Sequence, residues 1–191
     1  MELNFFENEQ QVSAVEKFGI IDPMSIKKQG SAYISYEEKD DWDVEVESHN
    51  REDIFFNPID GNIIFYRSVN SRQEKQKSCD AMIHTTDIII FIEIKNWKTK
   101  HKNNKGEKIS FWKTAVEQLE NTIAHFCTAH PKQKYTKKYA YISNKHKPFF
   151  TFPISTTEEI FKDKTNGFIL KVSNSIDFEH LKLKDSDLIL K

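Results

Sequence analysis

Three charged side chains near the middle of the sequence, Asp80, Glu93 and Lys95, have the types and spacing that metal-assisted phosphodiester hydrolysis requires. They belong to "SCDAMIHTTDIIIFIEIKNW", residues 78–97, a stretch typical of two β-strands joined by a tight turn. Carboxylate oxygens are ligands that Mg²⁺ prefers, and a lysine ammonium beside them can orient a water molecule or stabilise pentavalent phosphorus. The alternative is a salt bridge without chemistry, since a buried carboxylate is also stable when it is paired.

Alternation along the second predicted strand separates an apolar face from a charged one. The core face would carry Ile88, Ile90, Ile92 and Ile94, and the opposite face Ile89, Phe91, Glu93 and Lys95. A two-residue turn at Thr85-Thr86 predicts that Asp80 lies directly opposite Phe91. Glu93 would then be the diagonal neighbour of Asp80 on the same face, with roughly 7–8 Å between the two backbones. A turn one residue longer would break this registration.

Asp80, the second strand and Glu93-Ile94-Lys95 resemble the core motif of the PD-(D/E)XK nuclease superfamily, the restriction-endonuclease-like fold. The resemblance implies that Asp80 and Glu93 bind Mg²⁺ or Mn²⁺, that the Ile94 carbonyl is a further ligand, and that Lys95 is the catalytic lysine. Many members carry a glutamine on the helix after the motif, and Gln118 matches it. The resemblance covers a little under half of the chain.

The sequence departs from the family pattern at several positions. Cys79 stands where a proline often precedes the aspartate, and Thr122 stands where a tyrosine often follows the glutamine. Some members use a glutamate of the first helix as an added ligand, for which both Glu9 and Glu16 are candidates. Because a bare Glu-x-Lys tripeptide is common, the prediction depends on the strand context, the upstream aspartate and the helix with Gln118 together.

The residues of the motif must be positioned by strands and helices, and the order of these elements in the sequence predicts an α/β, or mixed α+β, fold. Its central mixed sheet would be flanked by helices, with an extra hairpin region near the N-terminus. Hydrophobic periodicity predicts helices over residues 7–19, 110–129 and 157–162, and strands around "SAYISY", "DWDVEVES", "YAYIS" and "GFILKV". Residues 53–66 are predicted to form a hairpin that turns at Asn57-Pro58 or Asp60-Gly61, and residues 68–77 a polar loop.

The chain is predicted to be one domain over residues 1–191, since no repeat and no Gly/Ser linker interrupts it. The nuclease-like core would span about 63–143, preceded by a helix and hairpins over 7–62 and followed by an extension over 148–191. Aromatic residues make up 13% of the 191 residues, which argues against a disordered chain.

Charge is distributed unevenly although the net charge is only −1. Residues 1–66 contain 5 Lys/Arg and 15 Asp/Glu, a net charge of −10, whereas residues 67–147 contain 17 and 7, a net charge of +10. A basic segment attracts phosphates whatever the total charge. The alternative is that the acidic and basic segments neutralise one another in the fold.

Two lysine clusters are the candidate nucleic-acid contacts. The loop after the motif carries Lys98, Lys100, Lys102 and Lys105, interleaved with Trp97, His101 and Trp112, and the second cluster includes Lys137 and Lys138. Lysines interleaved with aromatic rings suit a strand whose bases stack and whose phosphates need counter-charges. A solvated charged loop would have the same composition.

These observations predict a metal-dependent nuclease that acts on nucleic acid, with DNA favoured over RNA, and a homodimer as one way to cut both strands. The alternative is a catalytically silent copy of the fold that serves as an interaction, inhibitor or immunity protein. The longest apolar run, "IIIFI", is too short to cross a bilayer, and no secretory signal begins the sequence. Cys79 and Cys127 follow no zinc or disulfide spacing, so a cytoplasmic location is predicted.

Overall fold

The computed structural model describes residues 3–12, 16–26, 29–37, 41–48, 53–69, 71–95, 111–144 and 154–183. Its largest element is a six-stranded mixed sheet with the spatial order β1-β5-β8-β9-β10-β11. The strands of this sheet are β1 (Gln10–Gln11), β5 (Phe55–Pro58), β8 (Ala81–His84), β9 (Ile88–Lys95), β10 (Lys137–Asn144) and β11 (Ile169–Val172).

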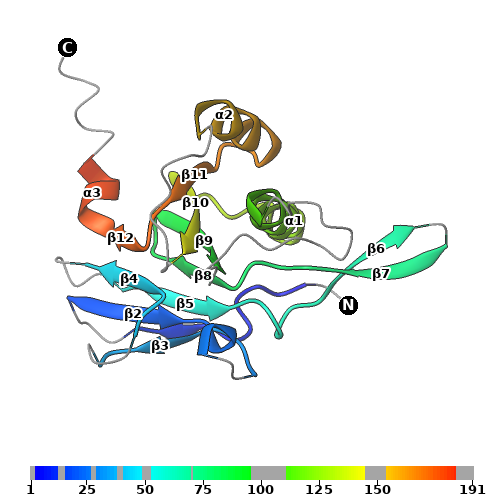
Figure 1. Cartoon of the computed structure of the whole chain (residues 1–191). Helices are drawn as coiled ribbons and strands as arrows, with labels where there is room; N and C mark the ends of the chain where they lie inside the picture. The colour runs from blue at the N-terminus through cyan, green and yellow to red at the C-terminus, as the bar shows by residue number, and fades with distance from the viewer. Residues whose placement is uncertain are drawn as a thin grey trace, which may run out of the picture.

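Strand β9 lies inside the sheet, antiparallel to β8 on one side and parallel to β10 on the other. The chain passes from β9 to β10 through the helix α1 (Phe111–Ala129), and from β10 to β11 through the helix α2 (Ile154–Lys164). Parallel neighbours need such crossovers. Both helices cover the same face of the sheet (Figure 1). The continuous apolar sequence of β9 is explained by burial on both faces.

A four-stranded sheet with the order β12-β4-β2-β3 covers the opposite face of the central sheet (Figure 1). It consists of β2 (Lys17–Ile21), β3 (Tyr33–Ser35), β4 (Val44–Glu47) and β12 (Ser175–Asp177). The short helix η1 (Pro23–Ile26) follows β2, and the helix α3 (Phe178–Leu183) follows β12. The protein therefore has three layers, in which the central sheet lies between helices and a second sheet.

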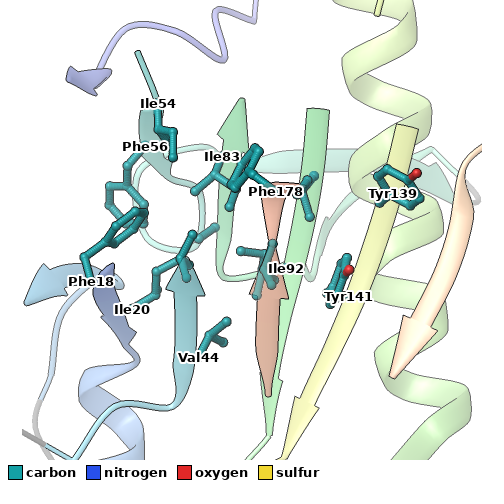
Figure 2. Close-up of a cluster of buried hydrophobic side chains, with 14 of the residues drawn as sticks. Phe18, Ile20, Val44, Ile54, Phe56, Ile83, Ile92, Tyr139, Tyr141 and Phe178 are labelled. Atoms are coloured by element: carbon teal, nitrogen blue, oxygen red, sulfur yellow. The ribbon is translucent and has the colours of Figure 1, made fainter. Parts of the chain in front are cut away.

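Two separate hydrophobic cores fill the spaces between these layers. Between the two sheets, Phe18, Ile20 and Val44 pack against Phe56, Ile83 and Ile92 (Figure 2). Between the central sheet and the helices, Ile89 and Phe91 pack against a buried stripe of α1. That stripe consists of Ala115, Leu119, Ile123 and Phe126, spaced at the three- and four-residue intervals of one helix face.

A two-stranded arm forms the third sheet of the molecule. Its strands are β6 (Phe65–Val69) and β7 (Arg72–Gln76), which pair antiparallel and project away from the layers (Figure 1). Ser71 at the turn has a φ of 63°. We call residues 65–77, which include both strands and Lys77, the β6–β7 arm.

Three sequence predictions about the first 77 residues are wrong. The helix predicted over 7–19 is replaced, in its described part, by β1 and the start of β2, because backbone groups there bond to other strands; the Val12 N–H, for example, donates to the Ile54 carbonyl at 2.8 Å. The predicted hairpin over 53–66 does not form, since β5 pairs with β1 and β8 instead. The predicted polar loop over 68–77 is most of the β6–β7 arm.

The predicted mixed α/β class is confirmed, as are the central hairpin, the helix over 110–129 in its described part and the strand at "YAYIS". Ile88, Ile90, Ile92 and Ile94 face one core while Ile89 and Phe91 face the other, as alternation along β9 predicts. In the described part of the chain, no helix has the length and apolar character that a membrane span requires.

Candidate active site

The hairpin of β8 and β9 has a different register from the one its sequence predicts. The Thr85 N–H donates to the Ile88 carbonyl at 2.9 Å, so the two turn residues are Thr86 and Asp87. The Thr85 hydroxyl fixes this turn by accepting the N–H groups of Asp87 and Ile88, at 3.3 and 3.1 Å. Met82 rather than Asp80 therefore faces Phe91, which moves Asp80 along the hairpin toward Glu93.

Asp80 lies directly before β8, where the regular ladder ends. Its N–H donates to the Ile92 carbonyl at 3.0 Å, although the register pairs Ile92 with Ala81. Two consecutive residues thus oppose one residue of β9, which is the arrangement of a β-bulge and re-aims the side chain. The Asp80 carboxylate accepts the N–H of Ile94, so it is fixed against the residue that follows Glu93.

Glu93 is completely buried, and its carboxylate forms an ion pair with the Lys95 ammonium group. The Lys95 side chain is 15% exposed and so connects this buried pair with the solvent. Neither carboxylate oxygen of Glu93 has a hydrogen-bond partner among the described residues, apart from this ion pair. A buried carboxylate with so few partners is costly in free energy and is typical of a functional site.

Helix α1 contributes Gln118, which links the two halves of the site. The Lys95 ammonium donates to Gln118 Oε1 at 3.0 Å, and Gln118 Nε2 donates to the Ser78 carbonyl at 2.8 Å. Gln118 is only 9% exposed, so its orientation is fixed by these two bonds and by packing. The glutamine that the resemblance implies is therefore in contact with Lys95.

Burial and nearby negative charges raise the pKa values of both carboxyl groups. Burial raises the pKa of Asp80 to about 7, opposed by the positive charge of Lys95 and assisted by the charges of Asp22 and Asp60. The pKa of Glu93 lies well above its usual range because of burial first and the charge of Asp80 second. Two carboxyl groups whose charged forms destabilise each other favour a cation between them.

Asp22 and Asp60 were not predicted as site residues, and Thr122 was predicted only as a departure from the family pattern. Asp22 follows β2 in the second sheet and Asp60 follows β5, where its N–H donates to the Asp80 carbonyl at 3.3 Å. The Thr122 hydroxyl accepts the Cys79 N–H at 2.9 Å and donates to the Gln118 carbonyl at 2.8 Å. Only the tertiary arrangement brings these residues to the site, so no local signal could have identified the two aspartates.

The N-terminal glutamates do not join the site. Glu9 lies at the turn end of the hairpin, with its carboxylate 2.7 Å from His84 Nε2. Glu16 is exposed and directly precedes β2. The site lies near the other end of that strand, where Asp22 follows β2 and its charge acts on Asp80. Neither glutamate is therefore placed to act as the added ligand.

The predicted nucleic-acid lysines fall into two groups. Lys98, Lys100, Lys102 and Lys105 lie outside the described residues. Lys137 pairs with Ile88 and so lies seven residues along the sheet from the Lys95 position, a distance of roughly 23 Å at the rise of a strand. Its ammonium donates to the Leu181 and Lys182 carbonyls, and that of Lys138 to the Asn166 carbonyl. Their role in binding nucleic acid stays a prediction.

The oxygen atoms around Asp80 and Glu93 decide whether a divalent cation fits the site. Within the ranges described above, no three His, Cys, Asp or Glu side chains are close enough together to hold a metal ion. The implied set needs only two carboxylates, Asp80 and Glu93, with the backbone carbonyl of Ile94 as a third oxygen. These are hard ligands, and among the described residues the Glu93 oxygens contact only the Lys95 ammonium group, so the residues fit Mg²⁺ or Mn²⁺.

No match was found when the chain was compared with protein-family models, with curated proteins and with solved structures. The function must therefore be inferred from the site and from its arrangement in the fold.

Proposed function

We propose that this protein is a metal-dependent nuclease of the PD-(D/E)XK type that hydrolyses phosphodiester bonds of nucleic acid, with DNA favoured over RNA. The observation that carries the proposal is the meeting of Asp80, Glu93 and Lys95 at one end of a buried hairpin, with Gln118 bonded to the lysine. A carboxylate pair with raised pKa values, of which Glu93 is buried and Asp80 half-buried, beside a partly exposed ammonium group is typical of catalytic centres.

The order of elements around the site also supports the proposal. Within the central sheet, the chain runs from β5 to β8 and β9, then through α1 to β10, which is the strand, strand, strand, helix, strand order of the family core; the β6–β7 arm is inserted between β5 and β8. The family core also has an initial helix, and in the described part of the chain before β5 the only helix is η1. The agreement therefore concerns the part of the core that carries the site residues.

Asp80, Glu93 and the Ile94 carbonyl would hold the cation. Bound Mg²⁺ or Mn²⁺ would lower the pKa of a coordinated water and offset the charge that develops on the phosphoryl oxygens. Lys95 would orient the attacking water or donate to a phosphoryl oxygen, as a preorganised positive group. Gln118 holds the Lys95 ammonium from the helix side, and the Ile94 N–H holds the Asp80 carboxylate, so neither group must reorganise during the reaction.

The proposal is tested by cleavage of plasmid, linear duplex, single-stranded DNA and RNA, each with Mg²⁺, with Mn²⁺ and with EDTA. We expect metal-dependent cleavage that Glu93→Gln and Lys95→Ala each reduce to background, while the control Lys162→Ala, at an exposed position on α2, cleaves like the wild type. Circular dichroism must show that the variants are folded. Cleavage that persists in both site variants, or in EDTA, would reject this site as the catalytic centre.

A second candidate function follows from the Glu93–Lys95 ion pair itself. Such a pair can be purely structural, and residues 1–66 carry a net charge of −10 that could bind a basic partner. The protein would then be an inhibitor, immunity or scaffold protein with a silent site. Calorimetric titration with Mn²⁺ separates the two functions, because only the nuclease should bind the cation and lose that binding in Glu93→Gln.

A further inference from the structure

The β6–β7 arm is fixed to the helix that carries Gln118. The ring of Phe65, at the base of the arm, stacks on His125 of α1 with centroids 4.4 Å apart and an angle of 10°. The Gln76 side chain, which faces Phe65 across the arm, has its Oε1 3.0 Å from His125 Nε2. These contacts hold the base of the arm in a defined direction although its tip projects from the molecule (Figure 1).

One face of the arm presents an aromatic ring beside a positive charge. Tyr66 faces Lys75 across the two strands, so the side chains share a face with Cβ atoms about 5 Å apart. Tyr66 is 56% exposed, and Lys75 and Lys77 are exposed as well. A large exposed aromatic residue beside a lysine suits a base that stacks on the ring while its phosphate approaches the ammonium group.

A pocket of about 410 Å³ lies between β7 and α1, and Gln118 of the candidate active site lines it. Lys75 and Lys77 line it from the arm, and Thr114, Asn121 and Gln118 line it from the helix. Gln118 is the residue that donates to the Ser78 carbonyl and accepts from Lys95, so the pocket ends beside the catalytic lysine.

The charge of the arm suits an anionic occupant. Residues 65–77 contain four Lys/Arg and one Asp/Glu, a net charge of +3. The pocket is also lined by Glu74 and Glu117, and Glu117 lies 3.9 Å from Lys113 in an ion pair along α1. Phosphates would therefore follow the lysine side of the pocket.

We propose that the β6–β7 arm and the pocket beside it bind a single strand of nucleic acid and direct it toward Asp80, Glu93 and Lys95. This inference rests on the proposed nuclease function, since the strand is then the substrate. A single strand is favoured over a duplex because stacking on Tyr66 requires a base that is not already stacked between its neighbours.

The experiment measures fluorescence anisotropy of a labelled oligothymidylate of about 20 nucleotides with the full chain in EDTA, so that no cleavage occurs. Tyr66→Ala should weaken binding roughly five- to a hundred-fold, the usual range for removing one stacking partner. Lys75→Gln with Lys77→Gln should reduce the slope of log affinity against log salt by about 1.4, for two lost phosphate contacts on a single strand.

Matched controls separate these effects from general loss of charge or aromatic surface. Lys162→Gln with Lys164→Gln removes two exposed lysines of α2 that do not line the pocket, and Tyr33→Ala removes a tyrosine that is 40% exposed on β3. Both control proteins should bind like the wild type. A ribonucleotide strand of the same length distinguishes DNA from RNA as the source of the phosphates.

The possible failures of the two proposals are distinguishable. Wild-type protein that does not bind the single strand, arm variants that bind like the wild type, or equally tight arm-dependent binding of a duplex would each overturn the inference, even if the protein cleaves DNA. Arm-dependent binding of the single strand without metal-dependent cleavage would support the binding surface and reject the nuclease.

Discussion

The Lys95 ammonium group lies between two acceptors of different kinds, the buried Glu93 carboxylate and the Gln118 amide oxygen. The carboxylate stabilises the positive charge, whereas the amide fixes its direction without competing for the proton. A lysine held in this way loses little freedom when it acts, which is the condition for electrostatic stabilisation of a transition state. Gln118 is therefore a positioning residue that acts through Lys95.

Replacing Gln118 tests this division of roles. We expect Gln118→Ala to lower the kcat of metal-dependent cleavage roughly 10- to 100-fold, the usual cost of losing a residue that orients a site, with a much smaller change in KM. Steady-state kinetics on the substrate preferred by the wild type measures the effect. Gln133→Ala, an exposed glutamine in the loop before β10, is the control. An equal loss in both variants, or a loss in KM alone, would contradict the positioning role.

Asp80 gives the stability of the protein a pH dependence whose sign can be worked out. Its folded-state pKa of about 7 exceeds the roughly 3.9 of an unfolded aspartate. Between these values the folded protein keeps a proton that the unfolded chain has released, so the group's contribution to the free energy of unfolding falls as pH rises from about 4 to 7.

Asp80→Asn cannot ionise and should lack this part of the pH dependence. We expect its Tm relative to the wild type to rise steadily from about pH 4 to pH 8 in metal-free buffer. Above pH 7, added Mg²⁺ should raise the Tm of the wild type but not that of the variant, because ligands that bind the folded state stabilise it. Parallel Tm curves for the two proteins would show that Asp80 ionises as an ordinary aspartate.

At the scale of elements, α1 holds the segment that precedes Asp80 at two successive residues. Gln118 bonds to the Ser78 carbonyl, and the Thr122 hydroxyl accepts the Cys79 N–H. The two helix residues are one turn apart, so they lie on the same face of α1. The helix thus fixes the short segment, Ser78 and Cys79, that connects the β6–β7 arm with Asp80 and β8.

Thr122→Val removes the acceptor of a buried N–H without changing the side-chain volume much. We expect the free energy of unfolding to fall by about 1–3 kcal/mol, the cost of leaving a buried donor unsatisfied. Urea unfolding measures it, and Thr122→Ser should restore most of the loss. Thr128→Val is the control, because the Thr128 hydroxyl also bonds to a carbonyl of its own helix but is exposed. Equal losses at both positions would mean that the bond to Cys79 contributes nothing.

The sequence predicted those elements whose determinants are local. Alternation of the isoleucines in β9 and the apolar spacing of α1 predicted both elements and the faces they bury. The predicted register of the hairpin was wrong because the turn was placed at Thr85-Thr86, whereas the Thr85 hydroxyl accepts the N–H groups of Asp87 and Ile88 and so places the turn at Thr86 and Asp87. The helix predicted over 7–19 is wrong because Val12 and Phe18, which were assumed to share one helix face, belong to different parts of the fold. Val12 follows β1 and bonds to Ile54 beside β5, whereas Phe18 lies in β2.

At the scale of the whole molecule, β9 is the strand on which both cores depend. Ile90 faces the second sheet and Phe91 faces the helices, and both side chains are fully buried. The convergence of Asp22, Asp60 and Asp80 is a property of this layering, since each comes from a separate part of the sequence. It could not be read from any single segment.

Ile90→Ala should destabilise the whole protein by about 2–5 kcal/mol, as large-to-small changes in buried positions do. Ile169→Ala on β11 of the same sheet is the matched control, because that isoleucine is 40% exposed. We expect its effect to be below about 1 kcal/mol. Chemical denaturation followed by circular dichroism measures both, and similar losses would show that the core does not centre on β9.

The pairing of β12 with β4 affects how the protein can be made. Ser175 is the register partner of Glu45, so 130 residues separate two strands that lie side by side. During synthesis on a ribosome, the edge of β4 has no neighbour until that late segment has emerged, although β2 and β3 are already present. We expect nascent chains that stop before β12 to remain bound by chaperones or to aggregate through that open edge, because unpaired strand edges associate readily.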